Sequence, residues 1–334
     1  MGTGHVMRCL ALAQAWQDAG GHAVFVIAPG APGIEERLKT EGAEVVAVDD
    51  EPGGDRDVDE ALRVARRYDA AWIVVDGYHL SGGYHRRLKR DTHRVLRIDD
   101  NREVDVDGAD ILVNPNAFAT PAMYEDVTST GRMLLGTQFT PLRREFTVRR
   151  GETRHIADAA TRVLVTLGGG DVDNVTLTVM QGLGRLEVPG LEVTVLVGGS
   201  NPHLDALTRA ADEMRCAVRL EQNVIDMPAR LAWADLALSA GGSTCWEMAF
   251  MGLPVVTLVI AENQRTVADS IEAAGAGRNL GWFEEIGVQA IADVVDRLLH
   301  APDDRRRMSQ AGRVLVDGGG AGRIVEAMCP QQER

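Results

Sequence analysis

A glycine turn between a strand-like and a helix-like segment has the residue types needed to bind a phosphate. Residues 236–239 form the strand-like run, and the helix-like run ends near Gly252. A strand, a tight turn and a helix start place several backbone N–H groups at one point, where the helix dipole adds partial positive charge. The simpler alternative is a turn whose serine caps the helix. The residues expected to hold the anion are Gly241, Gly242, Ser243 and Thr244.

Two further features extend this candidate nucleotide site. Glu247 lies about one helical turn beyond the glycines, where its carboxylate can accept hydrogen bonds from ribose hydroxyls. A second glycine turn follows the strand-like residues 162–167 and contains Gly168, Gly169 and Asp171. Glycine turns after strands are common, so the second turn supports the interpretation only in combination with the first. Together the two turns predict a nucleotide site.

Two neighbouring amides open a helix directly after the strand-like residues 254–260. Asn263 and Gln264 each carry donors and an acceptor, which allows them to recognise sugar hydroxyls. The alternative is that Asn263 only caps its helix. We therefore expect this pair to contact the sugar of a bound ligand, with helix capping as the competing interpretation.

His5 is the candidate general base. It follows Gly4 at the point where a glycine-rich start becomes a helix over residues 6–19. A helix N-terminus disfavours a positively charged imidazolium, and a neutral imidazole can take a proton from water. The alternative is a histidine that caps the helix or only donates a hydrogen bond to a ligand. A helix with such a start normally follows a buried strand, so we also expect a strand ahead of it.

A carboxylate and a phenol end the most apolar strand-like run of the N-terminal half, residues 71–76. Asp76 is a candidate for contacting the sugar or for orienting a partner side chain, with capping of the next loop as the alternative. The Tyr78 hydroxyl is a candidate sugar ligand. Asp99 and Asp100 end a later strand and suggest a metal site, but adjacent residues on a strand point to opposite faces. We therefore predict no metal site.

Composition is that of a globular protein large enough for two domains. The 334 residues are 45% hydrophobic and 4% aromatic, and the net charge is −14. These values argue against a basic or stacking surface for nucleic acid, but allow a nucleotide held by backbone N–H groups. Four widely spaced cysteines favour free thiols in a reducing cytosol. The sequence shows neither a membrane-spanning run nor a signal peptide, so we expect a cytoplasmic protein. We also expect no cofactor and no obligatory protein partner.

Near-continuous apolar strands alternate with amphipathic helices along the chain, a pattern that indicates parallel sheets covered on both faces. A polar stretch without a clear period at residues 147–160 separates the predicted domains, 1–150 and 160–334. The predicted fold is α/β, with two doubly wound Rossmann-like domains facing each other across a cleft. Ligands bind such domains at the carboxyl ends of the strands. The predicted strands are residues 22–28, 44–48, 71–76, 94–98, 111–114, 162–167, 192–197, 217–221, 236–239 and 254–260.

The order of several short motifs resembles a known enzyme family. It resembles the UDP-2,4-diacetamido-2,4,6-trideoxy-β-L-altropyranose hydrolases of pseudaminic acid biosynthesis and the related spore-coat polysaccharide proteins. The first motif begins Gly2-Thr3-Gly4-His5. The similar segments are residues 2–10, 75–78, 98–100, 134–146, 166–169, 239–247 and 263–264.

This resemblance implies a fold of the GT-B type, related to the lipid II N-acetylglucosaminyltransferase. It implies a metal-independent, inverting attack of water on the anomeric carbon of a UDP-sugar, with UDP as the leaving group. The catalytic histidine of the family falls on His5, its substrate tyrosine on Tyr78 and its sugar-contacting asparagine on Asn263. The chain departs from the expected family pattern in three ways, by the missing leading strand, by Gly77, and by an extra glycine within residues 168–171 where the family tends to have serine.

The expected function is therefore that of a UDP-sugar hydrolase with His5 as the base. A true glycosyltransferase that uses the same base on an acceptor hydroxyl is the first alternative, with an acceptor pocket expected along residues 78–84. A nucleotide-sugar sensor without catalytic activity is the second alternative. It would keep the nucleotide turns but would not depend on a neutral histidine.

Overall fold

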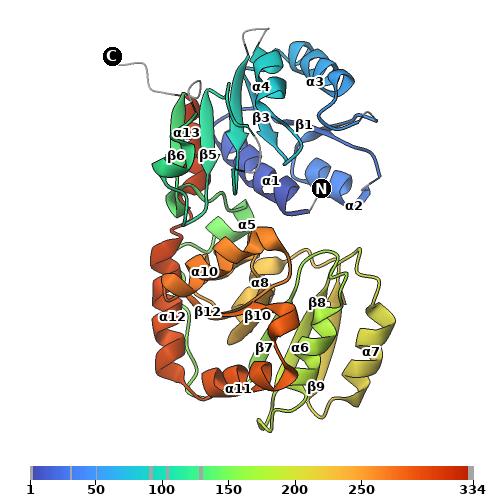
Figure 1. Cartoon of the computed structure of the whole chain (residues 1–334), viewed down its shortest axis with the longest axis vertical. Helices are drawn as coiled ribbons and strands as arrows, with labels where there is room; N and C mark the ends of the chain where they lie inside the picture. The colour runs from blue at the N-terminus through green and yellow to red at the C-terminus, as the bar shows by residue number, and fades with distance from the viewer. Residues whose placement is uncertain are drawn as a thin grey trace. The chain divides into compact units, whose positions relative to one another are not determined.

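The computed structural model describes residues 3–30, 32–49, 51–89, 93–102, 105–127 and 131–329 (Figure 1). The chain divides into two compact units. Unit 1 comprises Met1–Thr147 together with Gly318–Arg334, and unit 2 comprises Val148–Asp317. Both units are built on parallel sheets, which confirms the predicted α/β class with two Rossmann-like domains. Of the helices in the described ranges, none combines the length and hydropathy that a membrane crossing requires.

Within the described residues, unit 1 contains two parallel sheets. One pairs β1 (Val24–Ile27) with β2 (Glu44–Ala47), and the other has the order β3-β4-β5-β6. The strands of the larger sheet are β3 (Trp72–Asp76), β4 (Arg94–Ile98), β5 (Ile111–Asn114) and β6 (Arg132–Leu135). The helices of this unit are α1 (Thr3–Asp18), α2 (Pro32–Thr40), α3 (Asp55–Arg67), α4 (Gly82–Leu88), α5 (Arg144–Thr147) and α13 (Gly320–Met328).

Alternating side chains on β4 explain why helices cover both faces of the larger sheet. Leu96 and Ile98 belong to a core cluster that includes Leu12 of α1 and Ile324 of α13. Val95 belongs to a different cluster, formed with residues of α3 and α4. Since successive residues of a strand point to opposite faces, each face buries its own set of apolar side chains. This packing fixes α1, which carries His5, against the sheet.

Unit 2 has one parallel sheet with the order β12-β11-β10-β7-β8-β9. Its strands are β7 (Arg162–Thr166), β8 (Glu192–Val197), β9 (Ala217–Gln222), β10 (Leu236–Ala240), β11 (Val255–Val259) and β12 (Gly277–Trp282). The helices are α6 (Val175–Leu183), α7 (Leu204–Glu213), α8 (Met227–Trp233), α9 (Thr244–Phe250), α10 (Arg265–Ala273), α11 (Val288–Leu299) and α12 (Pro302–Leu315).

The strand order of unit 2 creates a switch point between β7 and β10. The chain builds outward from β7 through β8 to β9, then returns and continues on the other side with β10, β11 and β12. In doubly wound sheets, ligands bind outside the carboxyl ends of the two strands at which the order reverses. The fold therefore predicts that a ligand of unit 2 binds at the turns that follow β7 and β10.

The structure departs from the sequence-based expectations in three places. β6 and β12, the edge strands of the two larger sheets, were not among the predicted strands. The C-terminal segment from Gly318 groups with unit 1, whereas the predicted second domain ran to residue 334. The physical reason is that Ile324 and Met328 of α13 pack into the core of unit 1. The strand predicted ahead of α1 and Gly2 lie outside the described residues.

His85 on α4 is fully buried, and its titration should make unit 1 sensitive to acid. Burial, followed by the nearby Arg97 guanidinium, lowers the pKa of His85 to about 4. A histidine in an unfolded chain titrates at about 6.5, so the unfolded state binds the extra proton first as the pH falls. The free energy of unfolding should therefore decrease below about pH 6.5, by about 3 kcal/mol in total at pH 4.

Urea unfolding between about pH 7 and about pH 4.5 checks this expectation. His85→Leu removes the titrating ring and should flatten the dependence of unfolding free energy on pH. His300→Gln replaces an exposed imidazole and should leave the dependence as it is in the wild type. The same slope in the wild type and in His85→Leu would show that His85 does not cause the acid sensitivity.

Candidate functional site

Residues from a helix start and a strand end meet at the carboxyl edge of the larger sheet of unit 1. His5 and Arg8 lie in the first turns of α1, three residues apart and therefore on one face of the helix. Asp76 is the last residue of β3. Gly4 is exposed at the start of α1, immediately before His5. The fold thus brings together two candidates, His5 and Asp76, that are far apart in the sequence.

The imidazole of His5 is held by the carboxylate of Asp76. His5 Nδ1 lies 2.8 Å from Asp76 Oδ1, and only 12% of the His5 side chain and 3% of the Asp76 side chain are exposed. An ionised carboxylate only accepts hydrogen bonds, so Nδ1 carries the proton and donates it. The second ring nitrogen, Nε2, then keeps its lone pair, which is the arrangement of a histidine that acts as a general base.

Arg8 connects this pair to a second carboxylate. Its Nε and Nη2 donate to the two oxygens of Asp76, each at 2.6 Å. Its Nη1 donates to both oxygens of Asp100, at 2.7 and 2.9 Å. Both oxygens of Asp76 are therefore engaged by the protein, an arrangement that suits the predicted role of orienting a partner side chain, and its contact with a sugar stays a prediction. Arg8 was not singled out in the sequence, although its spacing from His5 places it on the same helix face.

Charge pairing keeps both carboxylates ionised in spite of their burial. Burial alone would raise the pKa of Asp76, but the Arg8 guanidinium and the hydrogen bond from His5 hold it well below its usual range. Asp100 behaves in the same way, since burial opposes ionisation while Arg8 lowers the pKa of this carboxyl. Two negative charges and one guanidinium thus surround the Nδ1 side of His5.

Tyr78 lies beside the ring of His5. The two rings meet edge to face with centroids 4.9 Å apart, and the Tyr78 hydroxyl donates to Asp100 Oδ2 at 3.1 Å. The carbonyl of Gly77, between Asp76 and Tyr78, accepts a hydrogen bond from the buried guanidinium of Arg97 at 2.9 Å. The predicted candidates His5, Asp76 and Tyr78 therefore lie in one hydrogen-bonded group, in which Asp100 is a further member.

Asp99 and Asp100 have separate partners, as expected for adjacent residues at a strand end. Asp99 Oδ2 accepts a hydrogen bond from the hydroxyl of Tyr124 at 2.6 Å. Asp100 Oδ1 accepts one from the side chain of Asn116 at 3.0 Å, in addition to the bonds from Arg8. The part of the chain that the structure describes contains no cluster of three or more His, Cys, Asp or Glu side chains arranged to hold a metal ion.

In unit 2, the two predicted glycine turns follow the two strands of the switch point. Gly168 and Gly169 come after β7, and Gly241 and Gly242 come after β10, and these strands are direct neighbours in the sheet. Both turns therefore lie at the carboxyl edge of the same part of the sheet. This is the position at which doubly wound domains bind their ligands.

The turn after β10 leaves its backbone accessible. Ser243 is exposed and its side chain makes no capping hydrogen bond to α9, so the simple serine cap considered for this turn is not formed. A side chain added at Gly242 would meet open space. Thr244 and Glu247 are half-buried in the first turns of α9. The turn can thus present the hydroxyls of Ser243 and Thr244 to an anion, whereas the N–H groups of Gly241 and Gly242 already donate to backbone carbonyls. Glu247 lies further along the same helix.

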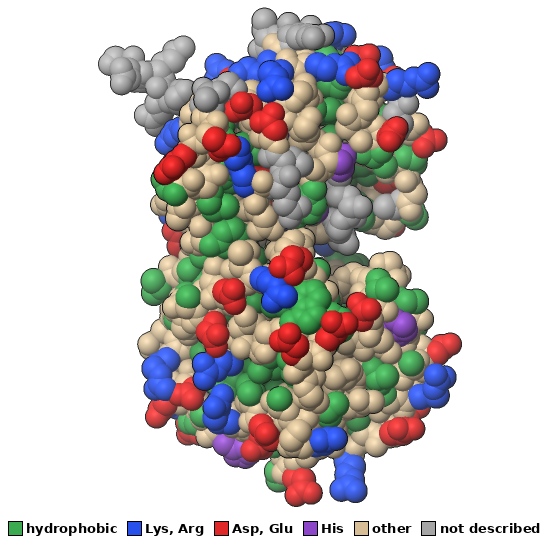
Figure 2. All heavy atoms as spheres, viewed as in Figure 1, with side chains coloured by type: hydrophobic (Ala, Val, Ile, Leu, Met, Phe, Trp, Pro, Cys, Tyr) green, Lys and Arg blue, Asp and Glu red, His purple; other side chains and the backbone are tan. Residues whose placement is uncertain are grey.

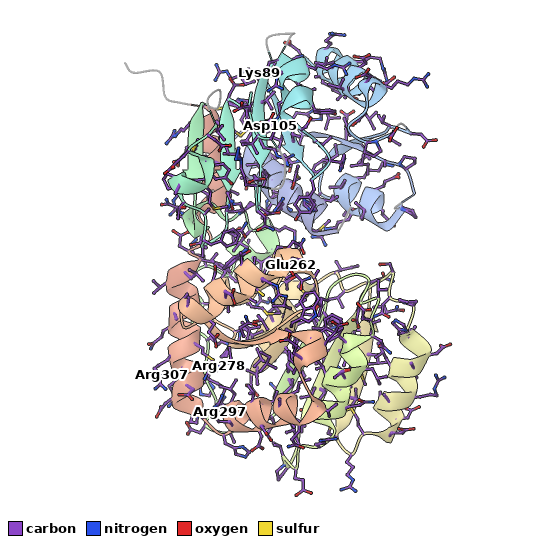
Figure 3. The ribbon with its side chains drawn as sticks, viewed as in Figure 1. Lys89, Asp105, Glu262, Arg278, Arg297 and Arg307 are labelled. Carbon is purple, nitrogen blue, oxygen red and sulfur yellow. The ribbon has the colours of Figure 1, made fainter. Side chains whose placement is uncertain are left out.

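Asn263 and Gln264 lie next to this turn. Both belong to the short 3-10 turn η4 (Glu262–Gln264), which follows β11 and is marked by the label of Glu262 in Figure 3. A Cβ atom at Gly241 would come within 2.6 Å of the backbone oxygen of Gln264, so only glycine permits this close approach. The side chain of Gln264 accepts a hydrogen bond from the N–H of Ile260 at 3.1 Å, while Asn263 is exposed.

The turn after β7 differs from the expectation in one respect. Both oxygens of Asp171 accept hydrogen bonds from the first N–H groups of α6, those of Val175 at 2.8 Å and of Thr176 at 3.0 Å. The amino end of α6 is therefore occupied by a carboxylate of the chain itself and is not offered to a phosphate. The exposed Gly168 and Gly169 remain as the part of this turn that can approach a ligand.

Surface charge agrees with the small-molecule interpretation. On the face shown in Figure 2, basic side chains lie among acidic ones over both units. A protein that binds nucleic acid without sequence preference needs basic residues gathered along one face. The visible distribution, like the net charge of −14, does not favour such a partner.

Comparisons with known sequences find a similarity between unit 2 and a glycosyltransferase domain. Residues 163–316 match the glycosyltransferase family 28 C-terminal domain. The spore coat polysaccharide biosynthesis protein SpsG of Bacillus subtilis is 25% identical over 194 residues, covering 58% of this chain and 55% of the relative. An uncharacterised protein of Methanocaldococcus jannaschii is 21% identical and is also covered over 55% of its length. The chain thus matches about half the length of these curated relatives.

A shorter match is closer in sequence. The UDP-N-acetylglucosamine–N-acetylmuramyl-(pentapeptide) pyrophosphoryl-undecaprenol N-acetylglucosamine transferase of Acidithiobacillus ferrooxidans is 32% identical over 130 residues, which cover 37% of this chain and 36% of that protein. Among solved structures, MurG of Acinetobacter baumannii is similar over 98% of this chain and 96% of its own, with a TM-score of 0.69 and 17% identity. The glycotransferase of kitacinnamycin reaches a TM-score of 0.70 at 18% identity, with 98% and 96% coverage. Residues 163–316 therefore resemble the glycosyltransferase family 28 C-terminal domain, in a chain that has the GT-B fold.

Proposed function

We propose that this protein is a nucleotide-sugar hydrolase, which cleaves the anomeric C–O bond of a UDP-sugar with inversion and releases UDP and the free sugar. The observation that carries the proposal is the hydrogen bond between His5 Nδ1 and Asp76, which leaves Nε2 as a base. The GT-B fold and the glycosyltransferase family 28 domain support a nucleotide-sugar as the substrate. The motif resemblance supports water as the acceptor and UDP-2,4-diacetamido-2,4,6-trideoxy-β-L-altropyranose as the first substrate to test.

In the proposed mechanism, Nε2 of His5 takes a proton from water as the water oxygen attacks the anomeric carbon. A new C–O bond forms on one face of the sugar, while the bond to the UDP oxygen breaks on the other and UDP leaves with the electron pair. Asp76 stabilises the imidazolium that results, as the carboxylate does in other histidine bases. The proton then passes from His5 to solvent, which restores the base.

The binding roles are divided between the two units. The turn of Gly241, Gly242, Ser243 and Thr244 approaches the leaving diphosphate, where its two hydroxyls and the positive end of the α9 dipole take up the charge that develops. Gly168 and Gly169 approach the nucleotide from the neighbouring turn. Asn263 and Gln264 contact the sugar hydroxyls, as does Tyr78 in unit 1. The reaction as written needs no metal ion and no cofactor.

Glu247→Ala should weaken the binding of UDP by about tenfold, because a hydrogen bond to a charged group typically contributes between about 1.5 and 3 kcal/mol. The loss should be smaller for 2′,3′-dideoxy-UDP, which lacks the ribose hydroxyls that the carboxylate accepts. Isothermal titration with both ligands measures this difference. Glu213→Ala, at the exposed C-terminal end of α7, is the matched control. Equal dissociation constants for wild type and Glu247→Ala would remove Glu247 from the ribose site.

A glycosyltransferase is the second candidate function. It is favoured by the 32% identity to an N-acetylglucosamine transferase over 130 residues. In that reaction the same base would take the proton of an acceptor hydroxyl instead of that of water. A nucleotide-sugar sensor would bind UDP-sugars without turning them over, and its response should survive His5→Ala.

Release of UDP from a panel of UDP-sugars, with and without hydroxyl acceptors and in the presence of a chelator, separates these functions. The hydrolase should release UDP and free sugar without an acceptor. Release that depends on an added acceptor would favour the transferase. Tight binding of UDP-sugars with no release under any of these conditions would favour the sensor.

A further inference from the structure

Arg8 makes more charged hydrogen bonds than a residue that simply supports a helix start would need. Its guanidinium donates two bonds to Asp76 and two to Asp100, and 11% of its side chain is exposed. A planar guanidinium can hold two carboxylates in fixed positions, which an ammonium group cannot do. Arg8 therefore determines both where the Asp76 oxygens lie and how much positive charge they receive.

The Asp76 oxygen that Arg8 holds in place decides between the two neutral forms of His5. Nδ1 lies 2.8 Å from Asp76 Oδ1 and 3.1 Å from Arg8 Nη2. If Nδ1 carries the proton, it makes a short charge-assisted bond to the carboxylate. If Nδ1 carries the lone pair, it accepts a longer bond from Arg8 but faces an oxygen lone pair of Asp76 at 2.8 Å. The form with the proton on Nδ1 is favoured for two reasons. Its charge-assisted bond to Asp76 is the stronger of the two bonds, and it avoids the repulsion between the lone pairs of Nδ1 and Asp76 Oδ1.

Asp100 limits how far Arg8 can neutralise Asp76. It is fixed in place by hydrogen bonds from the Asn116 side chain at 3.0 Å and the Tyr78 hydroxyl at 3.1 Å. One guanidinium is thus shared by two ionised carboxylates, and the group keeps one excess negative charge near Nδ1. That excess charge favours a proton on His5, whereas the guanidinium opposes it.

We propose that Arg8 is a positioning residue, which holds the Asp76 carboxylate so that neutral His5 carries its proton on Nδ1, and that the sharing of Arg8 between Asp76 and Asp100 controls how readily His5 takes a second proton. The structural part of this proposal concerns the free protein. Its consequence for catalysis rests on the proposed function, in which neutral His5 is the active form.

Other titratable and charged groups lie near His5 and Asp76 and can also influence the titration of His5. The Tyr78 ring packs against His5, and His79 in the same loop is close enough to interact electrostatically with it. The thiol of Cys9 on α1 contacts Asp76 Oδ2 at 3.5 Å, and burial raises the pKa of this thiol. Arg97 on β4 is linked to the same loop through the carbonyl of Gly77. Arg8→Met and Asp100→Asn keep all of these side chains, so a shift in the titration of His5 reports on the substituted residue.

Nitrogen-15 NMR of histidine-labelled protein measures the protonation of His5 directly and needs no turnover. The signals of His5 are those that disappear in His5→Ala. In the wild type at neutral pH, the ring should show a proton on Nδ1 and a bare Nε2. Arg8→Met should raise the pH of half-protonation by about one to two units, because it removes an opposing positive charge. Asp100→Asn should lower it by about one unit, because Asp76 then receives the whole guanidinium charge.

Arg87→Met is the matched control. Arg87 also bridges two carboxylates of unit 1, but these are Asp55 and Asp59 of α3. It should leave the His5 titration unchanged. Opposite shifts in Arg8→Met and Asp100→Asn are the signature of shared charge, since a merely structural role would not move the two titrations in opposite directions. If Arg8→Met does not fold, the titration of His5 in Asp100→Asn tests the proposal alone. The same pH of half-protonation in Asp100→Asn and in the wild type would overturn the proposal.

Kinetics then separate this proposal from the proposed function. The acidic limb of the pH–rate profile should move to higher pH in Arg8→Met, so that activity lost at neutral pH returns in part as the pH is raised. NMR shifts as expected without any UDP-sugar turnover would leave the role of Arg8 standing and overturn the function. Two results would overturn the role of Arg8 and leave the proposed function standing. In the first, the wild type turns over a UDP-sugar but carries the proton of neutral His5 on Nε2. In the second, Arg8→Met has the same pH–rate profile as the wild type.

Discussion

His5→Ala should reduce the turnover of a UDP-sugar by about a thousandfold and leave the dissociation constant of UDP within about twofold of the wild type. The reason is the proposed division of roles, in which the base is a residue of unit 1 and the turns proposed to bind UDP are in unit 2. Activation of water by a positioned base contributes between about a hundredfold and ten-thousandfold to a rate. Steady-state turnover and calorimetric UDP binding on the same preparation measure the two quantities.

His22→Ala controls for the loss of a histidine in the same unit. Its side chain is 55% exposed and pairs with Glu44 on the surface, so turnover should stay close to that of the wild type. If His5→Ala lost UDP binding and turnover together, His5 would be a binding residue or the fold would be damaged. Circular dichroism and thermal unfolding of the variant distinguish those two causes.

Asp76→Asn should lower kcat by about a thousandfold or more, although the side chain keeps its size. Asp76 Oδ1 accepts from His5 Nδ1 and from Arg8 Nη2, while Oδ2 accepts from Arg8 Nε. Whichever way the asparagine amide turns, its NH2 group faces one of these donors. When it faces His5, Nδ1 must accept, and the proton moves to Nε2, where it blocks the base.

A combined measurement of kcat and of the His5 tautomer checks this prediction. Asp59→Asn is the matched control, because it neutralises an exposed carboxylate of α3 that pairs with Arg87. It should change neither quantity. A variant Asp76→Asn that kept the proton on Nδ1 and still lost kcat would contradict the tautomer explanation, and one that kept its full kcat would remove Asp76 from the mechanism.

The architecture follows from the sequence because the strands of parallel sheets carry a strong local signal. β5 is buried at every position and β10 likewise, and such continuous apolar runs are easy to recognise. The edge strand β12 includes glycine, arginine and asparagine and is only partly buried, so its pattern resembles that of a loop. β6 lies at the other sheet's edge and begins with an exposed arginine. Edge strands need less apolar surface, and this explains why both were missed.

The site was predicted in part, for a topological reason. Candidates such as Asp76 and Gly241 were recognised because they follow strands, and parallel strands end at one edge of a sheet. Which of them touch depends on strand order, which the sequence does not state. Asp100 was set aside as half of an unlikely metal pair, whereas its actual partner is Arg8. The role of Asp171 as the cap of α6 was missed because a carboxylate after glycines also suits a ligand turn.

The most direct test of the account is a single turnover experiment in water enriched in oxygen-18, followed by mass spectrometry of UDP and by proton NMR of the sugar. If water attacks the anomeric carbon, the bond that breaks is the one between this carbon and the UDP oxygen. UDP should therefore contain no label, and the first sugar formed should have the anomeric configuration opposite to that of the substrate. Label in the released nucleotide would show attack at phosphorus, and a retained configuration would show a covalent or front-face reaction. Either result would contradict a water molecule activated by His5.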